Sequence, residues 1–203
     1  MNISNCRTCK STDLIKAFDL GKQKLTGIFP KSKNEKVPSG SLAMTFCNNC
    51  KLLQLENSFN PDVMYGENYG YMSSLNKSMV NHLKKKANKL KKLLNLNNNC
   101  TVIDIGSNDG TFLNFFSNKV KLIGVDPTIK KLRKYYRKDI ECIPNYFSNE
   151  IFKNKTLKKV KLISSISMFY DLEDPCSFAQ DIFDILDKDG LWHLEQSYMP
   201  MML

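Results

Sequence analysis

The sequence of 203 residues lacks any long apolar run. No stretch approaches the roughly 18 uninterrupted apolar residues that a membrane helix needs. The first residues, MNISNCRTCK, also lack the apolar segment of a secretory signal peptide. These absences exclude a membrane-spanning helix and a cleaved leader, so we expect a cytoplasmic protein with no membrane partner.

Arginine is scarce, although the chain carries a formal net charge of +10 that comes mostly from lysine. Arginine makes the bidentate contacts to phosphates and bases that lysine does not. The lysine excess therefore favours a compositional bias over a nucleic-acid role, and we expect no nucleic-acid partner. A Lys-rich run over residues 84–92 lies in a predicted helix and indicates a solvated helix surface.

Seven cysteines are present in a chain without an export signal, which argues against disulfides. Four of them form two CxxC pairs, Cys6 with Cys9 and Cys47 with Cys50, separated by 37 residues. Each CxxC turn can direct two thiolates at one tetrahedral metal ion, and two turns complete a four-thiolate site. The spacing predicts a structural zinc ion; an iron–sulfur centre or redox chemistry is the alternative.

Composition divides the chain into three parts. Residues 1–56 form the expected zinc-binding domain, with strands over 14–18 and 42–46 but too few apolar residues for a core. Residues 57–98 form a connector and an amphipathic helix that Ser73 or Ser74 would cap. The helix carries apolar residues on one stripe: Leu75, Met79, Leu83, Ala87, Leu90 and Leu94.

Residues 99–203 alternate between strand and helix patterns. Strands are predicted over 101–105, 120–125, 140–143, 160–165 and 191–195, and helical segments over 110–117, 130–137, 148–154 and 176–186. This alternation is typical of an α/β fold whose parallel strands are joined by crossover helices. We therefore predict a Rossmann-like sheet preceded by a small zinc-ribbon domain.

A glycine loop, Asp104-Ile-Gly-Ser-Asn-Asp-Gly110, follows the first of these strands. Gly106 allows close approach of a ligand to the backbone, and the following helix would offer free N–H groups. The loop is not GxGxxG, so a dinucleotide is not favoured. A ligand with an amino-acid group fits: its carboxylate meets the loop amides, including that of Ser107, and its ammonium meets Asp104. This points to S-adenosylmethionine.

Further cofactor residues follow the other strands. Asp126 ends the second strand and can accept the hydroxyl hydrogens of an adenosyl ribose. Asn145 follows the third strand, where adenine would lie, with Tyr146 or Phe147 available for stacking. Ser165 and Met168 leave the fourth strand toward the same crevice, because ligands bind outside the carboxyl ends of parallel strands.

The sequence resembles the nucleotide-sugar C-methyltransferase family. The resemblance rests on the two CxxC pairs, the glycine loop, Tyr69-Gly-Tyr-Met-Ser-Ser-Leu-Asn, Ile166-Ser-Met-Phe-Tyr-Asp-Leu-Glu-Asp-Pro175 and Trp192-His-Leu-Glu-Gln-Ser-Tyr-Met-Pro200. It implies a zinc-binding domain, an S-adenosylmethionine-binding Rossmann-like domain, and cofactor contacts at Tyr71, Gly106, Asp126 and Asn145 and around Met168. Met72 stands where members often have Arg.

The resemblance also implies a later His-Glu-His segment that supplies the catalytic base, and this segment is absent from the 203 residues. The expected function is methylation of a nucleotide-linked keto-deoxysugar through an enolate. His193 lies within a predicted strand, so no base is assigned, while Glu195 and Tyr198 are better placed to line the substrate crevice. The alternatives are an inactive fragment that binds S-adenosylmethionine or zinc, and a zinc-ribbon nucleic-acid binder.

Overall fold

The computed structural model describes residues 2–25, 28, 30–66, 69–153, 155, 157, 159–198 and 201. Contacts group the chain into two compact units: Met1–Tyr71 with Glu173–Cys176, here the N-terminal unit, and Met72–Leu172 with Ser177–Leu203, here the sheet unit. The division into residues 1–56, 57–98 and 99–203 remains a prediction. Asn154, Met199 and Pro200, which belong to segments predicted above, lie outside the described residues.

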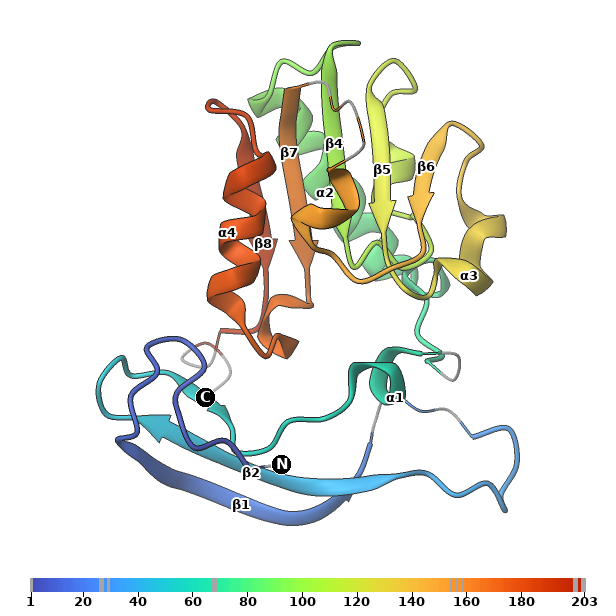
Figure 1. The fold of residues 1–203 in the computed structure, drawn as a ribbon. Coiled ribbons are helices and arrows are strands. Elements are labelled where there is room, and N and C mark those ends of the chain that lie inside the picture. Colours follow the sequence, from blue (N-terminus) through green and yellow to red (C-terminus); the bar gives the residue numbers. More distant parts are fainter. Residues whose placement is uncertain are drawn as a thin grey trace. The chain divides into compact units, whose positions relative to one another are not determined.

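The N-terminal unit is built on a small antiparallel sheet (Figure 1). Its strands are β1 (Leu14–Lys24), β2 (Ser39–Cys47) and β3 (Leu53–Leu55), followed by the short helix α1 (Pro61–Tyr65). The two strands predicted here are confirmed and are longer than the sequence indicated. Almost every residue of β1 is exposed, and in β2 only Ala43, Thr45 and Cys47 are buried, so the described part of this sheet buries few apolar side chains.

The sheet unit contains a parallel sheet in the order β6-β5-β4-β7-β8. The strands are β4 (Cys100–Ile105), β5 (Lys121–Val125), β6 (Ile140–Ile143), β7 (Lys159–Ile166) and β8 (Leu191–Glu195). The chain starts in the centre at β4, proceeds to β6 on one side, and returns to β7 and β8 on the other. The predicted Rossmann-like α/β class is thus confirmed, and the strand order reverses between β4 and β7.

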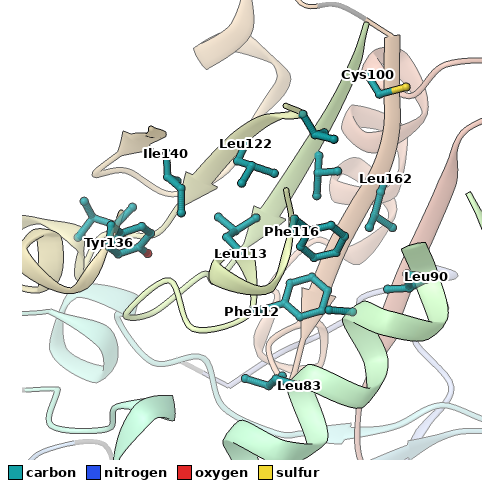
Figure 2. Packing of buried hydrophobic residues seen from close by; sticks show 14 residues of the cluster. Leu83, Leu90, Cys100, Phe112, Leu113, Phe116, Leu122, Tyr136, Ile140 and Leu162 are labelled. Atoms are coloured by element: carbon teal, nitrogen blue, oxygen red, sulfur yellow. The ribbon is translucent and has the colours of Figure 1, made fainter. Parts of the chain in front are cut away.

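Alternation along the strands creates two hydrophobic clusters, because neighbouring side chains point to opposite faces of a sheet. Val102, Leu122 and Leu162 belong to one cluster, which also takes up Leu83 and Leu90 of α2 (Lys77–Leu93) (Figure 2). The other cluster contains Ile103, Ile123 and Ile163 with Phe178 and Ile182 of α4 (Pro175–Ile185). Every residue of β4 is buried, so each face of this strand is covered.

Helix α2 begins later than predicted. Its N-cap is Asn76, whose side chain accepts hydrogen bonds from the N–H groups of Ser78 and Met79. Ser73 and Ser74 instead lie in the 3-10 turn η1 (Ser73–Leu75). Within the predicted apolar stripe, Leu83, Ala87 and Leu90 are buried, whereas Leu75 lies ahead of the helix and is exposed.

The remaining helical segments of this unit are short. The helices predicted over 110–117 and 130–137 are wrong in extent: the first is only the 3-10 turn η2 (Leu113–Phe115), and the second is α3 (Ile129–Leu132) followed by η3 (Arg133–Tyr135). Burial of Phe112, Leu113 and Phe116 in the core decides the path of the first segment, so tertiary packing overrides local propensity. Two further turns are η4 (Asn149–Phe152) and η5 (Phe169–Asp171).

Across the described residues, no helix combines the length and the apolar character needed to cross a membrane.

Candidate functional site

The glycine loop leaves β4 beside the point where the strand order reverses, which is where open α/β sheets bind ligands. Gly106 has φ +70, and a Cβ there would approach Met168 Cγ to 3.1 Å. Gly110 has φ +77, and a Cβ there would lie 2.6 Å from the ring of Tyr136. Both positions therefore require glycine, because backbone conformation and close packing act together.

The loop amides hold the loop itself together. The N–H groups of Gly106 and Ser107 donate to Val125 O at 2.9 and 3.4 Å, and that of Gly110 donates to Ser107 O at 2.9 Å. Because η2 is only a three-residue turn, the expected donors of a full helix N-terminus are not formed there. The contact of these amides with a ligand carboxylate therefore remains a prediction.

Asp126 directly follows β5 and is buried. Its Oδ2 accepts from Asn108 N at 2.8 Å, while Oδ1 accepts from Thr128 N at 2.7 Å and Thr128 Oγ1 at 2.6 Å. A carboxylate oxygen offers about two acceptor sites. In this arrangement Oδ2 of Asp126 can accept one more hydrogen bond, which is enough for a single ribose hydroxyl. The side chain also joins the glycine loop to the end of β5.

Asp104 lies at the end of β4 and is fully buried. Burial raises its pKa to about 7, with Ser164 opposing that shift and the charge of Asp126 adding to it. Ser164 Oγ donates to Asp104 Oδ1 at 2.5 Å. A buried carboxyl group whose pKa is near 7 ionises when a cation binds beside it, so Asp104 suits a ligand ammonium group.

The residues predicted to surround adenine fall into two groups. Asn145 and Tyr146 are exposed beyond the end of β6, and Asn145 Oδ1 accepts from Tyr146 N at 2.9 Å. Phe147 instead packs on Phe178, with ring centroids 5.1 Å apart. Tyr146 is thus exposed after β6, Phe147 belongs to the aromatic core, and the predicted stacking of Tyr146 on adenine remains a prediction.

The two cofactor residues predicted at the end of β7, Ser165 and Met168, have different surroundings. Met168 lies against Gly106, as described above, so the loops after β4 and β7 meet. Ser165 is fully buried, and its Oγ accepts from Trp192 Nε1 at 2.9 Å. The position of Ser165 is therefore that of a packing residue behind the loop.

Two side chains of the glycine loop have a role that the sequence reasoning missed. Asn108 Oδ1 accepts from Ser73 N at 3.0 Å, and Asp109 Oδ2 accepts from Ser74 N at 2.8 Å. These two hydrogen bonds join the loop to the backbone of η1 and fix the position of the segment ahead of α2. The sequence drew attention to Ser73 and Ser74, but as caps of the helix and not as partners of the glycine loop. Tyr71 belongs to the N-terminal unit, and its predicted cofactor contact remains a prediction.

Tyr136 is the second residue that the sequence reasoning missed. Its hydroxyl lies 2.8 Å from Ser107 Oγ and donates to Asn108 O at 2.7 Å. The ring also packs where a Cβ of Gly110 or Gly124 would stand. Tyr136 thereby supports the underside of the glycine loop, with burial as the main cause that raises the pKa of its hydroxyl.

The four predicted metal ligands come together in the N-terminal unit. Their sulfur atoms all lie within 4.8 Å of one another, with Cys6 to Cys50 and Cys9 to Cys47 at 3.5 Å. Tetrahedral zinc with bonds of about 2.3 Å separates its sulfurs by about 3.8 Å. All four cysteines are free thiols, so the set can hold a zinc ion.

The two CxxC turns have the same backbone design. Lys10 N donates to Cys6 O at 3.0 Å, and Lys51 N donates to Cys47 O at 2.9 Å. Both lysines have a left-handed backbone, with φ 60 and φ 66. Burial raises the pKa of Cys6, but hydrogen bonds from neighbouring backbone N–H groups and side chains outweigh it and give about 6. The first turn thus favours the thiolate of Cys6, the form that binds metal. At Cys50 the Leu52 N–H lowers the pKa, but burial and the neighbouring thiols outweigh it and raise the pKa to about 12.

Two known protein families match the regions that contain the four-cysteine cluster and the glycine loop. Residues 6–65 match the family described as "Putative zinc binding domain". Residues 79–198, more than half of the chain, match the family described as "Methyltransferase domain". The chain belongs to the methyltransferase domain family. Both family assignments agree with the two predicted cofactors, S-adenosylmethionine and zinc.

The chain is also similar to one curated protein and to one solved structure. The C-methyltransferase NovU of Streptomyces niveus is 24% identical over 208 residues, covering 99% of this chain and 49% of NovU. The chain therefore spans about half the length of that curated relative. The PH0226 protein of Pyrococcus horikoshii OT3 has the same fold, with a TM-score of 0.50 at 15% identity over 70% of this chain and 62% of that chain.

Proposed function

We propose that this methyltransferase-domain chain binds S-adenosylmethionine and takes part in C-methylation of a nucleotide-linked keto-deoxysugar. The observation that carries the cofactor is the meeting of Asp104, Gly106 and Asp126 at the reversal of strand order. The acceptor class rests on the family resemblance and on similarity to a C-methyltransferase along nearly the whole chain.

Each residue has a distinct task in this proposal. S-adenosylmethionine, when bound, supplies an electrophilic methyl group on a sulfonium. Asp104 pairs with the ammonium group, and the open backbone at Gly106 admits the ligand beside Met168. Asp126 accepts a ribose hydroxyl through Oδ2, while Tyr146 covers the adenine. The residues therefore bind and orient the donor, which lowers the entropic part of the barrier.

The four cysteines would hold zinc in a closed site. With four protein thiolates there is no open position for water or substrate, so this site serves folding and not chemistry. Within the Lys-rich run, the exposed lysines Lys84, Lys85, Lys89 and Lys92 form a solvated surface in this proposal.

Calorimetric titration of the zinc-loaded protein with S-adenosylmethionine tests the cofactor site. Gly106→Ala should weaken binding at least tenfold, because the added methyl group meets Met168 at a positive φ. Gly21→Ala is the matched control: Gly21 has φ +69 but open space around it, and it lies in the N-terminal unit. Absence of binding by the wild-type protein would refute the proposed cofactor.

The acceptor class needs a separate experiment. The protein is incubated with S-adenosylmethionine and a thymidine-diphosphate-linked 4-keto-6-deoxyhexose, and the products are analysed by mass spectrometry. A sugar nucleotide heavier by one methylene group is the expected product. If the protein binds the cofactor but leaves this sugar unmodified, the acceptor assignment is wrong and the cofactor assignment stands.

A further inference from the structure

The first segment of the sheet unit, residues 72–76, is held by the glycine loop and is called the strap below. It contains the 3-10 turn η1 and leads directly into α2. The first N–H groups of a helical turn have no partner inside the turn. In η1 these groups belong to Ser73 and Ser74, and they donate to Asn108 Oδ1 at 3.0 Å and to Asp109 Oδ2 at 2.8 Å. The glycine loop therefore caps η1 from a distant part of the chain.

Hydrophobic burial contributes little to the position of the strap. No residue of η1 is buried, and the Leu75 side chain is 76% exposed. The turn closes through the hydrogen bond from Leu75 N to Met72 O at 3.3 Å. A segment with few buried apolar contacts opens locally at a low cost in free energy. The hydrogen bonds to the loop therefore decide whether the strap is attached or released.

The two acceptors on the loop are fixed by further contacts. Asn108 is 8% exposed and Asp109 is 1% exposed. Asp109 Oδ1 accepts from the N–H and the hydroxyl of Thr111 at 3.1 and 2.6 Å. Asn108 has φ 52, a left-handed conformation that asparagine adopts more readily than most residues. Release of the strap removes a donor from each of two buried acceptors, which is unfavourable, so this loop geometry favours attachment.

Asn108 also contacts the carboxylate that binds ribose in the proposed function. Its N–H donates to Asp126 Oδ2 at 2.8 Å, and this is the oxygen with an acceptor site left for a ribose hydroxyl. Its carbonyl accepts from the Tyr136 hydroxyl at 2.7 Å. Asn108 therefore joins three parts of the site through hydrogen bonds: the strap, the carboxylate and the tyrosine that supports the loop.

Resting on the proposed function, we propose that attachment of the strap and binding of S-adenosylmethionine favour each other, with Asn108 and Asp109 as the positioning residues. A ribose hydroxyl on Asp126 fixes the oxygen that also accepts from Asn108 N, and this holds the loop in the conformation that caps η1. A ligand that meets a loop already ordered by the strap loses less conformational entropy on binding. Linkage requires each event to favour the other by the same factor.

Amide hydrogen exchange followed by NMR measures attachment directly. The N–H groups of Ser73 and Ser74 are monitored in the zinc-loaded protein with and without saturating S-adenosylmethionine. Coupling between two sites typically changes an affinity by about 5–150-fold, and we expect the cofactor to slow the exchange of both amides about tenfold. The N–H of Gly21 is the matched control, because it also donates to a carboxylate, Asp19 Oδ1 at 2.8 Å, but in the N-terminal unit. Its exchange should not change.

Ser73→Pro removes one donor and is compatible with the turn. Met72 has φ −138 and ψ 127, the extended conformation that a residue before proline prefers, and proline fits the first position of a helical turn. Asn108→Gly removes the matching acceptor and accepts the positive φ. Each variant should weaken S-adenosylmethionine binding about tenfold in calorimetry. The double variant should lose no more than either single variant, because both changes remove the same hydrogen bond.

Two further variants separate this role from a general loss of structure. Ser73→Ala keeps the N–H donor, so it should retain the affinity that Ser73→Pro loses. Leu75→Ala removes an exposed side chain of the strap and should bind like the wild type. Fluorescence of Trp192 reports that the sheet unit of each variant is folded. The exchange measurement uses the wild-type protein, so it decides the question even if a variant does not fold.

The outcomes separate the two proposals. Slower exchange of both strap amides with cofactor, and equal losses of affinity in the single and double variants, support the inference. Unchanged exchange in a wild-type protein that binds S-adenosylmethionine overturns it. Losses that add up in the double variant, or an equal loss in Ser73→Ala, also overturn it. A wild-type protein that does not bind S-adenosylmethionine overturns the proposed function instead.

Discussion

The two units of this protein are stabilised in different ways. The sheet unit buries apolar side chains on both faces of β4, and its core includes Val102, Ile103, Leu162 and Ile163. Among the described residues of the N-terminal unit, the buried ones are Cys6, Ala43, Thr45, Cys47 and Gln54. One unit therefore owes its stability to hydrophobic burial, and the other depends on its four-cysteine site.

This difference explains where each kind of functional residue lies. A rigid core positions the loops at the carboxyl ends of the strands, so buried carboxyl groups such as Asp104 and Asp126 can be held at fixed places. The N-terminal unit offers a metal ion in place of a core. Four predictions test this contrast, from the largest expected effect to the smallest.

Removal of zinc should unfold the N-terminal unit. Structural zinc contributes about 10–16 kcal/mol in small zinc domains, and the described part of this unit has no apolar core to replace it. Chelation, or Cys47→Ser, should abolish the dispersed amide NMR signals of β1 and β2. Fluorescence of Trp192, the only tryptophan of the chain and a residue of β8, should change little.

Cys142→Ser provides the control, because Cys142 lies in β6 and not in the metal cluster. It should leave the zinc content unchanged. If the chelated protein keeps its N-terminal amide signals, the contrast between metal and core is wrong for this unit.

Truncation of a core residue should show the complementary effect. Ile163 is fully buried in β7, and Ile163→Ala should lower the free energy of unfolding of the sheet unit by about 3–4 kcal/mol. Ile15 in β1 is 50% exposed, so Ile15→Ala should cost less than about 1 kcal/mol. Urea unfolding followed by Trp192 fluorescence and by far-UV circular dichroism measures both. Similar costs for the two variants would remove the distinction.

Asp104 should make the stability of the sheet unit depend on pH. Its pKa of about 7 in the folded state lies above the unfolded value of about 3.9, so the folded state binds more protons. The contribution of protonated Asp104 to the free energy of unfolding is fully present below pH 4 and is lost as the pH rises through 7. Between pH 5 and pH 7 the loss should be about 2 kcal/mol. Asp104→Asn should abolish this part of the pH dependence.

Asn is the suitable replacement because its Oδ1 can still accept from Ser164 Oγ, which lies 2.5 Å from Asp104 Oδ1. The difference between wild type and variant isolates Asp104 from every other group. Unfolding curves at several pH values that differ by a constant amount would show that the carboxyl does not titrate in this range.

The smallest effect is expected for an exposed ion pair of the N-terminal unit. Lys16 lies 3.1 Å from Asp19 and 3.3 Å from Glu56, and its side chain is about half exposed. Solvent screens such pairs, so Lys16→Met should leave the urea midpoint of unfolding of this unit unchanged within error. A clear shift of that midpoint would show that surface charge contributes to the stability of this unit beside the metal.

Local sequence pattern predicted much of this fold. Strand bounds agree with the structure to within a residue or two throughout β4 to β8, because buried parallel strands are continuous apolar runs. The helical segments after β4 and β5 were overestimated, since their apolar residues, such as Phe112 and Leu132, serve the core in short turns. Periodicity alone does not separate these cases.

The candidate site shows the same division. Asp104, Gly106 and Asp126 were identified from their places after strands, and the structure brings them together. Phe147 and Ser165 were named on the same basis but pack inward, because position after a strand does not fix the side-chain direction. The roles of Asn108 and Asp109 toward η1 involve partners 35 residues away, beyond any local pattern.

The sequence by itself determined the class of fold, the four cysteines and the acidic and glycine positions at the strand ends, because strand pattern and CxxC spacing are local properties. Only the tertiary structure decided that Asp126 is already bound by Asn108 and Thr128, that Tyr136 supports the loop, and that His82 meets Glu195 across 113 residues of chain. Such contacts depend on sheet order and helix docking, which bring distant residues within hydrogen-bonding distance.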